Sequence, residues 1–252
     1  MHPVLIRVGP FTLYAYGVMV AAGFGIVAYL AGRRAASFGF TRSEIIDLSI
    51  LMLVAGLFGA RVAYVAMHSA YYVQRPFEIL LLHHGGLVFY GGFLAAVTAA
   101  VIYTRVRRVS FWKIADLFSP FIALAHAVGR IGCFLNGCCY GAAVSCFFPL
   151  AVFFPGDTVY RHPVQVYSSV GLIGLFLFLR WRQDRRRFDG EVFLLYCVLY
   201  SLLRFLVEFL RGDNPLFMIG LTFSQAVSLA VFGVTCTILM VIRKRCARSS
   251  LR

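Results

Sequence analysis

Three arginines in apolar surroundings are the residues of this chain with the clearest capacity for chemistry. Arg61, Arg130 and Arg204 each lie inside or at the end of a long apolar segment. A charged side chain at membrane depth costs about 2.5–3.5 kcal/mol on insertion scales unless it is paired or faces water. The planar guanidinium fork matches the oxygens of a phosphate group. The three arginines therefore predict a polar cavity that binds an anion, and a phospholipid head group fits this description.

One acidic residue is spaced to act on these arginines. Glu208 follows Arg204 by four residues, so the two side chains share one face of a helix. The carboxylate can neutralise the guanidinium or orient it toward a ligand. A purely structural ion pair is the alternative, but it leaves Arg61 and Arg130 without partners.

The composition places these residues in a membrane protein. Hydrophobic residues make up 61% of the 252 residues and charged residues 13%, with a mean hydropathy of +0.83. A soluble fold with this composition would expose too much apolar surface. A membrane-spanning helix needs about 20 apolar residues, and seven such segments predict an all-α integral membrane protein that forms a single domain over residues 1–252. The segments are residues 12–32, 45–67, 86–104, 114–132, 164–179, 191–210 and 220–242. The first is too long for a cleaved signal peptide, and we expect it to be retained.

The basic residues indicate how the chain is oriented. Most of the 24 Lys and Arg residues follow the first, third, fifth and seventh segments. The positive-inside rule places these connections in the cytoplasm, which puts the N-terminus outside and the basic tail 243–252 inside. This placement argues against nucleic acid as the reason for the net charge of +14. The largest outer loop is expected at 133–163, and the three arginines lie in the outer halves of their helices, so the cavity should open outward.

Further polar residues and glycines lie at the same depth as the arginines. The glycines let a backbone approach another backbone or a ligand closely. They could form a collar around the ligand, or they could serve only to pack the helices, as Gly56 and Gly59 could. The polar residues and glycines at this level include Tyr16, Tyr90, Gly91, Gly92, His126, Asn136 and Gln225.

Several of these blocks resemble one known family. The segment Gly129 to Gly141, which reads GRIGCFLNGCCYG, resembles the signature of the prolipoprotein diacylglyceryl transferases, and the resemblance extends from about Gly9 to Ser228 in family order. The other matching blocks are residues 13–17, 59–64, 85–92, 161–167, 204–211 and 222–225.

The resemblance implies a function and a set of site residues. Members of this family move diacylglycerol from phosphatidylglycerol onto the lipobox cysteine of precursor lipoproteins, forming a thioether and releasing glycerol 1-phosphate. By this resemblance the chain works in the bacterial cytoplasmic (inner) membrane, with its active site toward the outer face and with no cofactor or metal. The implied catalytic residues are Arg130, Arg204, Glu208 and Tyr90. The implied substrate-binding residues are Arg130, Arg204, Arg61, Tyr16, Gly91, Gly92, Asn136 and Gln225.

Three positions depart from the family pattern. Tyr90 stands where the family commonly has a histidine, Cys133 where it has an asparagine and Cys138 where it has a glutamate. A tyrosine with a pKa of about 10 is a poor base at neutral pH. His84 is a candidate substitute, although an interfacial histidine without a catalytic role is the alternative.

The cysteines keep other interpretations open. Four of the seven, Cys133, Cys138, Cys139 and Cys146, lie in or beside the outer loop, where a disulfide is expected to be stable. They also permit a quinone-linked membrane thiol oxidoreductase, although no C-x-x-C pair is present. The arginines permit a non-enzymatic lipid or anion transporter, although the halves show no inverted repeat. A metal site that joins the cysteines to His83 and His84 lacks the expected ligand spacing.

Overall fold

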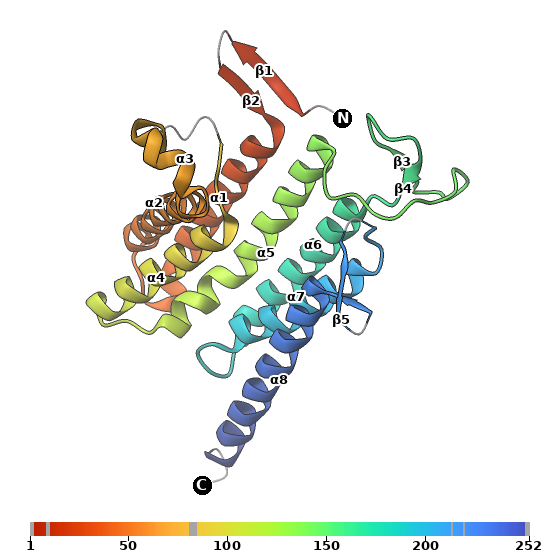
Figure 1. Cartoon of the computed structure of the whole chain (residues 1–252). Helices are drawn as coiled ribbons and strands as arrows, with labels where there is room; N and C mark the ends of the chain where they lie inside the picture. The colour runs from red at the N-terminus through yellow and green to blue at the C-terminus, as the bar shows by residue number, and fades with distance from the viewer. Residues whose placement is uncertain (1–2, 9–10, 81–84, 213, 219, 250–252) are drawn as a thin grey trace. The chain divides into compact units, whose positions relative to one another are not determined.

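The computed structural model of the chain is largely helical (Figure 1). It describes residues 3–8, 11–80, 85–212, 214–218 and 220–249. The chain divides into two compact units. The first unit combines Met1–Leu30 with Ala115–Arg252, and the second is Ala31–Ile114. Helices α1 (Ala15–Arg34) and α5 (Phe111–Asn136) each begin in one unit and end in the other.

The second unit is built on two long helices that pack closely. Helix α2 begins with a capping box, because the Thr41 side chain accepts from the Glu44 N–H and the Glu44 carboxylate accepts from the Thr41 N–H. A methyl group placed on Gly91 of α4 would lie 2.6 Å from the carbonyl oxygen of Gly59 in α2. Only glycines allow this approach. The elements of the unit are the 3-10 helix η1 (Ala35–Phe38), α2 (Arg42–Met67), α3 (Ser69–Gln74), the 3-10 helix η2 (Pro76–Leu80) and α4 (Phe89–Arg107).

The first unit packs its helices around a core between α5, α6 and α7. Ala123 and Ala127 of α5 lie against Leu172 of α6 and Val192 of α7, and all four side chains are buried. The small alanines let α6 approach, and the Ser169 hydroxyl of α6 donates to the Ala127 carbonyl at 3.1 Å. Helices α6 (Val164–Gln183), α7 (Glu191–Glu208) and α8 (Phe223–Ser249) follow one another in sequence, and α7 packs on both neighbours.

Short antiparallel hairpins lie next to the helix ends of this unit. Strand β1 (Val4–Val8) pairs with β2 (Phe11–Tyr14), directly before α1. Strand β3 (Val152–Phe153) pairs with β4 (Tyr160–Arg161), directly before α6. Strand β5 (Leu216–Met218) pairs with β6 (Leu221–Thr222), directly before α8.

The helices support the prediction of a membrane protein that crosses the bilayer several times. Each of the seven predicted segments contains a helix, although the first and the last begin with residues of strands β2 and β6. Six described helices are long and apolar enough to span a membrane, namely α1, α2, α4, α5, α6 and α8. Helix α7 is not among these six because its 18 residues include Glu191, Arg204 and Glu208. Helix α5 continues four residues beyond the predicted end at 132, so Arg130 lies within it.

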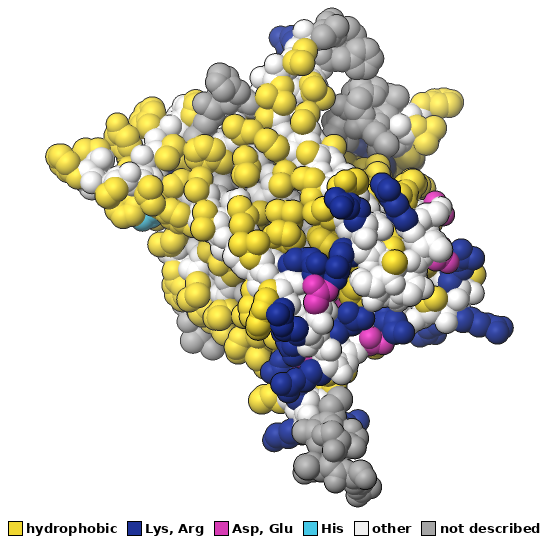
Figure 2. Space-filling model, turned by 180° about the vertical axis from the view of Figure 1, so that it is seen from behind, with side chains coloured by type: hydrophobic (Ala, Val, Ile, Leu, Met, Phe, Trp, Pro, Cys, Tyr) yellow, Lys and Arg dark blue, Asp and Glu magenta, His cyan; other side chains and the backbone are white. Residues whose placement is uncertain are grey.

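Basic residues gather at one end of α6, α7 and α8, which we call the basic end. The buried carboxylate of Glu191, in the first turn of α7, contacts Arg182 of α6 at 2.7 Å and Arg243 of α8 at 3.0 Å. Asp116 of α5 accepts from the N–H groups of Gly190 and Phe193, at 2.7 and 2.9 Å. These contacts place the last turn of α6 and the C-terminal part of α8 beside the first turn of α7. Figure 2 shows Lys and Arg side chains grouped on a face that is otherwise rich in hydrophobic side chains.

Candidate functional site

A small cavity with both polar and apolar lining residues lies between α5, α6 and α7, at their end opposite to the basic end. Arg130 and His126 reach it from α5, and Arg204 and Tyr200 reach it from α7. Its volume is about 10 Å³, which is the space for one water molecule. Its lining is completed by Ser168, Leu172, Leu203 and Val207. The structure thus brings together two of the three arginines that the sequence placed at one depth.

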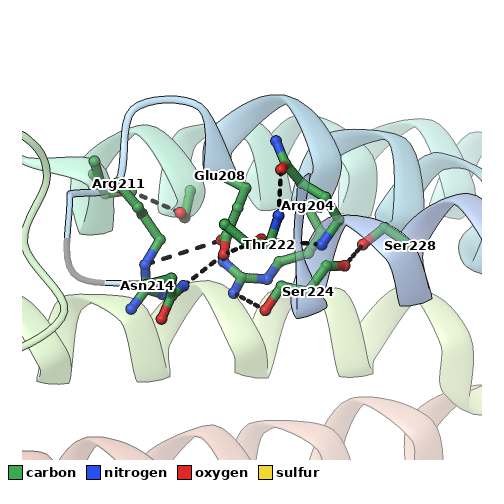
Figure 3. A network of polar contacts seen from close by, with 10 residues as sticks. Arg204, Glu208, Arg211, Asn214, Thr222, Ser224 and Ser228 are labelled. Atoms are coloured by element: carbon green, nitrogen blue, oxygen red, sulfur yellow. Dashed lines mark hydrogen bonds and ion pairs between the residues drawn. The ribbon is translucent and has the colours of Figure 1, made fainter. Parts of the chain in front are cut away.

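Arg204 is held by a fully buried carboxylate (Figure 3). Its Nη1 lies 2.9 Å from Oε2 of Glu208, one helical turn further along α7. Its Nη2 donates to the Ser224 hydroxyl of α8 at 3.0 Å. The predicted pairing of Arg204 with Glu208 is confirmed. Because two partners fix the guanidinium, it can present its remaining surface to the cavity in one orientation.

Glu208 is itself fixed by the chain that follows α7. Its Oε1 accepts from the Asn214 amide at 2.5 Å and from the Thr222 hydroxyl at 2.9 Å. Its Oε2 accepts no hydrogen bond from the part of the chain that the structure describes. It forms an ion pair with Arg204, and Nε of Arg211 lies 4.0 Å away. One carboxylate oxygen therefore accepts the hydrogen bonds that fix the side chain, and the other faces the two guanidinium groups.

Gln225 lies in the capping box that begins α8. The Thr222 N–H donates to Oε1 of Gln225 at 2.9 Å, and the Gln225 N–H donates to the Thr222 hydroxyl at 3.2 Å. Since the same Thr222 hydroxyl donates to Glu208, the capping box orients the carboxylate that orients Arg204 (Figure 3). In this structure Gln225 acts on the site through Thr222.

Arg130 has no comparable partner. The structure gives its half-buried guanidinium no hydrogen bond or ion pair with any residue that it describes. Arg204 lies close enough to exert a charge effect on it. Arg130 is a cation in the lining of this cavity, and the charge of the neighbouring Arg204 is neutralised by Glu208. One positive charge therefore remains for a ligand. The site is therefore suited to an anion.

Tyr16, Cys133 and Cys139 lie within electrostatic range of Arg130. A methyl group on Gly132 of α5 would lie 3.5 Å from the Tyr16 Cα, so α1 and α5 approach closely there. The half-exposed Tyr16 hydroxyl is within electrostatic range of Arg130, Cys133 and Cys138. A hydrogen bond from Cys133 and the positive charge of Arg211 lower the pKa of the Cys139 thiol, while burial raises the pKa of the Cys138 thiol. The exposed Asn136, the last residue of α5, hydrogen-bonds the Cys138 side chain.

The segment after α5 is hydrogen-bonded through its backbone to residues just before α6 and just after α7. The Gly141 N–H donates to the His162 carbonyl at 3.0 Å, and the Ala142 N–H donates to the Leu210 carbonyl at 2.8 Å. A methyl group on Gly141 would lie 2.6 Å from the Leu210 carbonyl oxygen. Gly141 is therefore needed for close packing beside the cavity. All six described cysteines, including Cys146, carry free thiols, so the expected disulfide is not present among them.

Arg61 lies in the second unit, where its donors are occupied. Its side chain is buried and donates to the carbonyl oxygens of Glu78, Ile79, Gly85 and Gly86, at 2.6 to 3.2 Å. These contacts join η2 to the segment before α4. A cavity of about 310 Å³ beside it is lined by Arg61, Tyr64, His68, Tyr71, Tyr72 and Glu78. The expected phosphate contact of Arg61 would have to replace bonds that fix the backbone.

The remaining predicted residues of the second unit have different environments. Gly91 and Gly92 pack against Gly59 and Gly56 of α2, which is the helix-packing role that the sequence left open. Tyr90, in the first turn of α4, is 68% exposed and contacts the Phe89 ring. His84, the candidate substitute for a base, lies outside the described residues.

Four residues of the site were not singled out from the sequence. Tyr200 precedes Arg204 by four residues, so the i,i+4 rule that identified Glu208 also indicates Tyr200. The T-x-x-Q pattern at 222–225 is a capping box, which could have located Thr222. Ser168 and Asn214 carry no local signal, because only the packing of α6 and of the chain after α7 brings them to the site.

Comparisons with known proteins cover nearly the whole chain. A family model described as prolipoprotein diacylglyceryl transferase matches residues 3–242. A Bacillus cytotoxicus protein named phosphatidylglycerol–prolipoprotein diacylglyceryl transferase is 35% identical over 251 residues, which cover 96% of this chain and 92% of that protein. A Bacillus cereus protein of the same name is 34% identical over the same shares of both chains.

Proposed function

Because the chain belongs to the prolipoprotein diacylglyceryl transferase family, we propose that it transfers diacylglycerol from phosphatidylglycerol to the lipobox cysteine of precursor lipoproteins. Family membership confirms the resemblance that the sequence motifs indicated. It also favours transfer over the thiol oxidoreductase and transporter alternatives. The single observation that carries the proposal is the guanidinium of Arg130, which has no partner among the described residues, beside the neutralised Arg204 in one cavity.

The two arginines bind the phosphate of the lipid. Arg130 supplies the net positive charge, and Arg204 supplies donors whose direction is set by Glu208 and Ser224. A guanidinium fork matches two phosphate oxygens at once. When the bond between the diacylglycerol carbon and the phosphate oxygen breaks, negative charge builds on the departing glycerol 1-phosphate. Preorganised donors at that position lower the barrier, because they need no rearrangement during the reaction.

The attacking group comes from the second substrate. The lipobox thiolate attacks the glycerol carbon that bears the phosphate ester, so a C–S bond forms while the C–O bond breaks. Glycerol 1-phosphate leaves with the electron pair, and the thiol proton passes to solvent. A thiol with a pKa of about 8.5 is a few per cent ionised near neutral pH, so a strong base is not essential. The exposed Tyr90 hydroxyl is proposed to contact the lipid phosphate or its glycerol.

Residues around the two arginines position them. Tyr16 lies beside Arg130 and is proposed to contact the head group together with Asn136. Gln225 acts through Thr222 and Glu208 on Arg204. Arg61 is proposed to fix the backbone from Glu78 to Gly86, and Gly91 and Gly92 to set the spacing of α2 and α4.

The site is proposed to face the outer side of the bacterial cytoplasmic membrane. The basic end at Glu191 carries arginines of α6 and α8, which the positive-inside rule places in the cytoplasm. The cavity lies at the other end of the same helices, next to the segment from 137 to 163. With α7 as the seventh span, the N-terminus is outside and the C-terminus inside. Since the cavity holds about one water molecule, its side chains must move apart when the lipid enters.

A transfer assay with purified protein tests the proposal. Vesicles of phosphatidylglycerol labelled in its diacylglycerol part are mixed with the protein and a lipobox peptide, and the thioether product is identified by mass spectrometry. Arg204→Ala is expected to lower the rate by at least about 100-fold, as for the loss of one transition-state donor. Arg180→Ala is the matched control, because Arg180 pairs with Asp184 at the basic end, and it should retain the wild-type rate. No product from the wild type, or equal rates for both variants, would contradict the proposal.

A further inference from the structure

Three thiols meet at the end of α5, at positions that the transfer reaction leaves unused. The Sγ atoms of Cys133, Cys138 and Cys139 all lie within 4.8 Å of one another, and all three side chains are half-buried.

The end of α5 brings the first two thiols together. The Cys138 N–H donates to the Cys133 carbonyl and the Gly137 N–H to the Phe134 carbonyl, both at 3.1 Å. Gly137 adopts a left-handed conformation, with φ +72°. These features define a Schellman motif, in which the side chains at the positions of Cys133 and Cys138 commonly contact each other. The backbone of the cap thus brings the side chains of Cys133 and Cys138 within contact distance.

The third thiol is held in place by strained backbone. Cys139 has φ +61°, and it is one of only two described residues other than glycine with a left-handed backbone. A residue with a Cβ rarely adopts this region unless its surroundings impose it. Here the Cys138 carbonyl accepts a hydrogen bond from Nε2 of Gln165 in α6 at 2.7 Å, and the Gly141 N–H donates a hydrogen bond to the His162 carbonyl. The chain is fixed on both sides of Cys139, and its side chain is kept in the cluster.

Two arginines lie close enough to the cluster to act on its charge. Arg130 acts electrostatically on Cys133 and Cys139, and Arg211 acts on Cys139. Three thiolates bound to a monovalent cation carry two net negative charges. The nearby guanidinium groups reduce the free energy of this charge, which lowers the cost of placing charged ligands at this depth.

We propose that Cys133, Cys138 and Cys139 bind one soft, thiophilic metal ion, with Cu(I) preferred, in a three-sulfur site. Metal–sulfur bonds of about 2.3 Å in a trigonal plane require sulfur atoms about 4.0 Å apart, so the three thiols need to move by less than about 1 Å. The cluster contains no histidine or carboxylate ligand among the described residues. This set suits Cu(I), which accepts three sulfur ligands, better than Zn(II), which takes four ligands in structural sites. Metal binding here does not depend on the transfer reaction.

Copper binding by the purified full-length protein tests this proposal. The reduced protein in detergent is titrated with Cu(I) under anaerobic conditions against a competing Cu(I) chelator. X-ray absorption at the copper edge then counts the sulfur neighbours. We expect one copper ion per chain with three sulfur neighbours. Cys146→Ser is the matched control, because Cys146 is an exposed cysteine of the same connection, and it should bind copper as the wild type does.

Two variants of Cys139 separate loss of a ligand from loss of the fold. Cys139→Ser should weaken copper binding by more than about 100-fold, which exceeds the usual effect of losing an outer-shell contact. Cys139→Gly removes the same ligand but suits the left-handed backbone, so it should fold at least as well and bind as weakly. Wild-type affinity in Cys139→Gly would overturn the proposal. So would two or fewer sulfur neighbours, displacement of copper by equimolar Zn(II), or a disulfide among the three cysteines in the native protein.

Discussion

Replacing Glu208 by glutamine isolates the charge that holds Arg204. Glutamine keeps an oxygen for the hydrogen bonds from Asn214 and Thr222 and removes only the negative charge 2.9 Å from Nη1 of Arg204. At an effective dielectric constant of 20 the lost attraction at this distance is about 6 kcal/mol. Because both groups are largely buried, the net cost of leaving the arginine unpaired is about 3–5 kcal/mol.

A second pair on the same chain provides the control. Arg180 and Asp184 have the same i,i+4 spacing and the same 2.9 Å separation, but their side chains are 30% and 50% exposed, against 18% and 0% for Arg204 and Glu208. Asp184→Asn should therefore cost about 0–1 kcal/mol. With about 2–4 °C per kcal/mol, thermal unfolding in detergent should shift by roughly 10 °C for Glu208→Gln and by less than about 4 °C for Asp184→Asn. Equal small shifts would refute the view that burial makes the Arg204 pair strong.

Three further predictions concern orientation, packing and the altered tyrosine. Reporter or labelling sites at Asp157 should be accessible from outside and sites at Arg185 from the cytoplasm, and the reverse result would contradict the orientation of the site. Gly91→Ala should destabilise the protein by about 1–3 kcal/mol, because the added methyl would lie 2.4 Å from the Ala63 Cβ, whereas Gly25→Ala, with nothing within 4 Å, should not. In the lipobox assay Tyr90→Phe should be slower than the wild type. Equal rates for wild type, Tyr90→Phe and Tyr90→His would eliminate a role for the hydroxyl.

The helices could be predicted from the sequence because each is a long apolar segment bounded by polar residues. Their ends could be predicted less well, since the ends depend on caps. Helix α5 continues to Asn136 because Gly137 adopts the left-handed conformation that closes a Schellman motif. The apolar pattern, which stops near 132, does not contain this information.

The two arginines of the cavity could be predicted from their depth in the bilayer, and the Arg204–Glu208 pair from helical spacing. Arg61 is predicted at the same depth in the bilayer, but its guanidinium donates hydrogen bonds to four backbone carbonyl groups of η2 and of the segment before α4. The fold of an irregular connection is not encoded in residue periodicity. The same limit applies to Asn214, which reaches Glu208 from the chain between α7 and α8.

The thiol cluster illustrates a signal that spacing rules miss. Cys133, Cys138 and Cys139 do not match a familiar metal motif, and from their positions a disulfide was the simpler expectation. The glycine at 137, directly after a helix, is the feature that predicts contact between Cys133 and Cys138. The left-handed backbone of Cys139 has no counterpart in the sequence and became visible only in the structure.

The proposed binding of the lipid phosphate by the guanidinium of Arg130 can be tested by comparing wild type, Arg130→Ala and Arg130→Lys in the transfer of labelled diacylglycerol to a lipobox peptide. Both variants should insert into the membrane and unfold near the wild-type temperature, because Arg130 has no partner among the described residues whose loss would destabilise the fold. Both should lose at least about 100-fold in rate, since the ammonium of lysine does not reproduce the planar fork. Near-normal transfer by Arg130→Ala would show that Arg130 does not bind the lipid phosphate during the reaction.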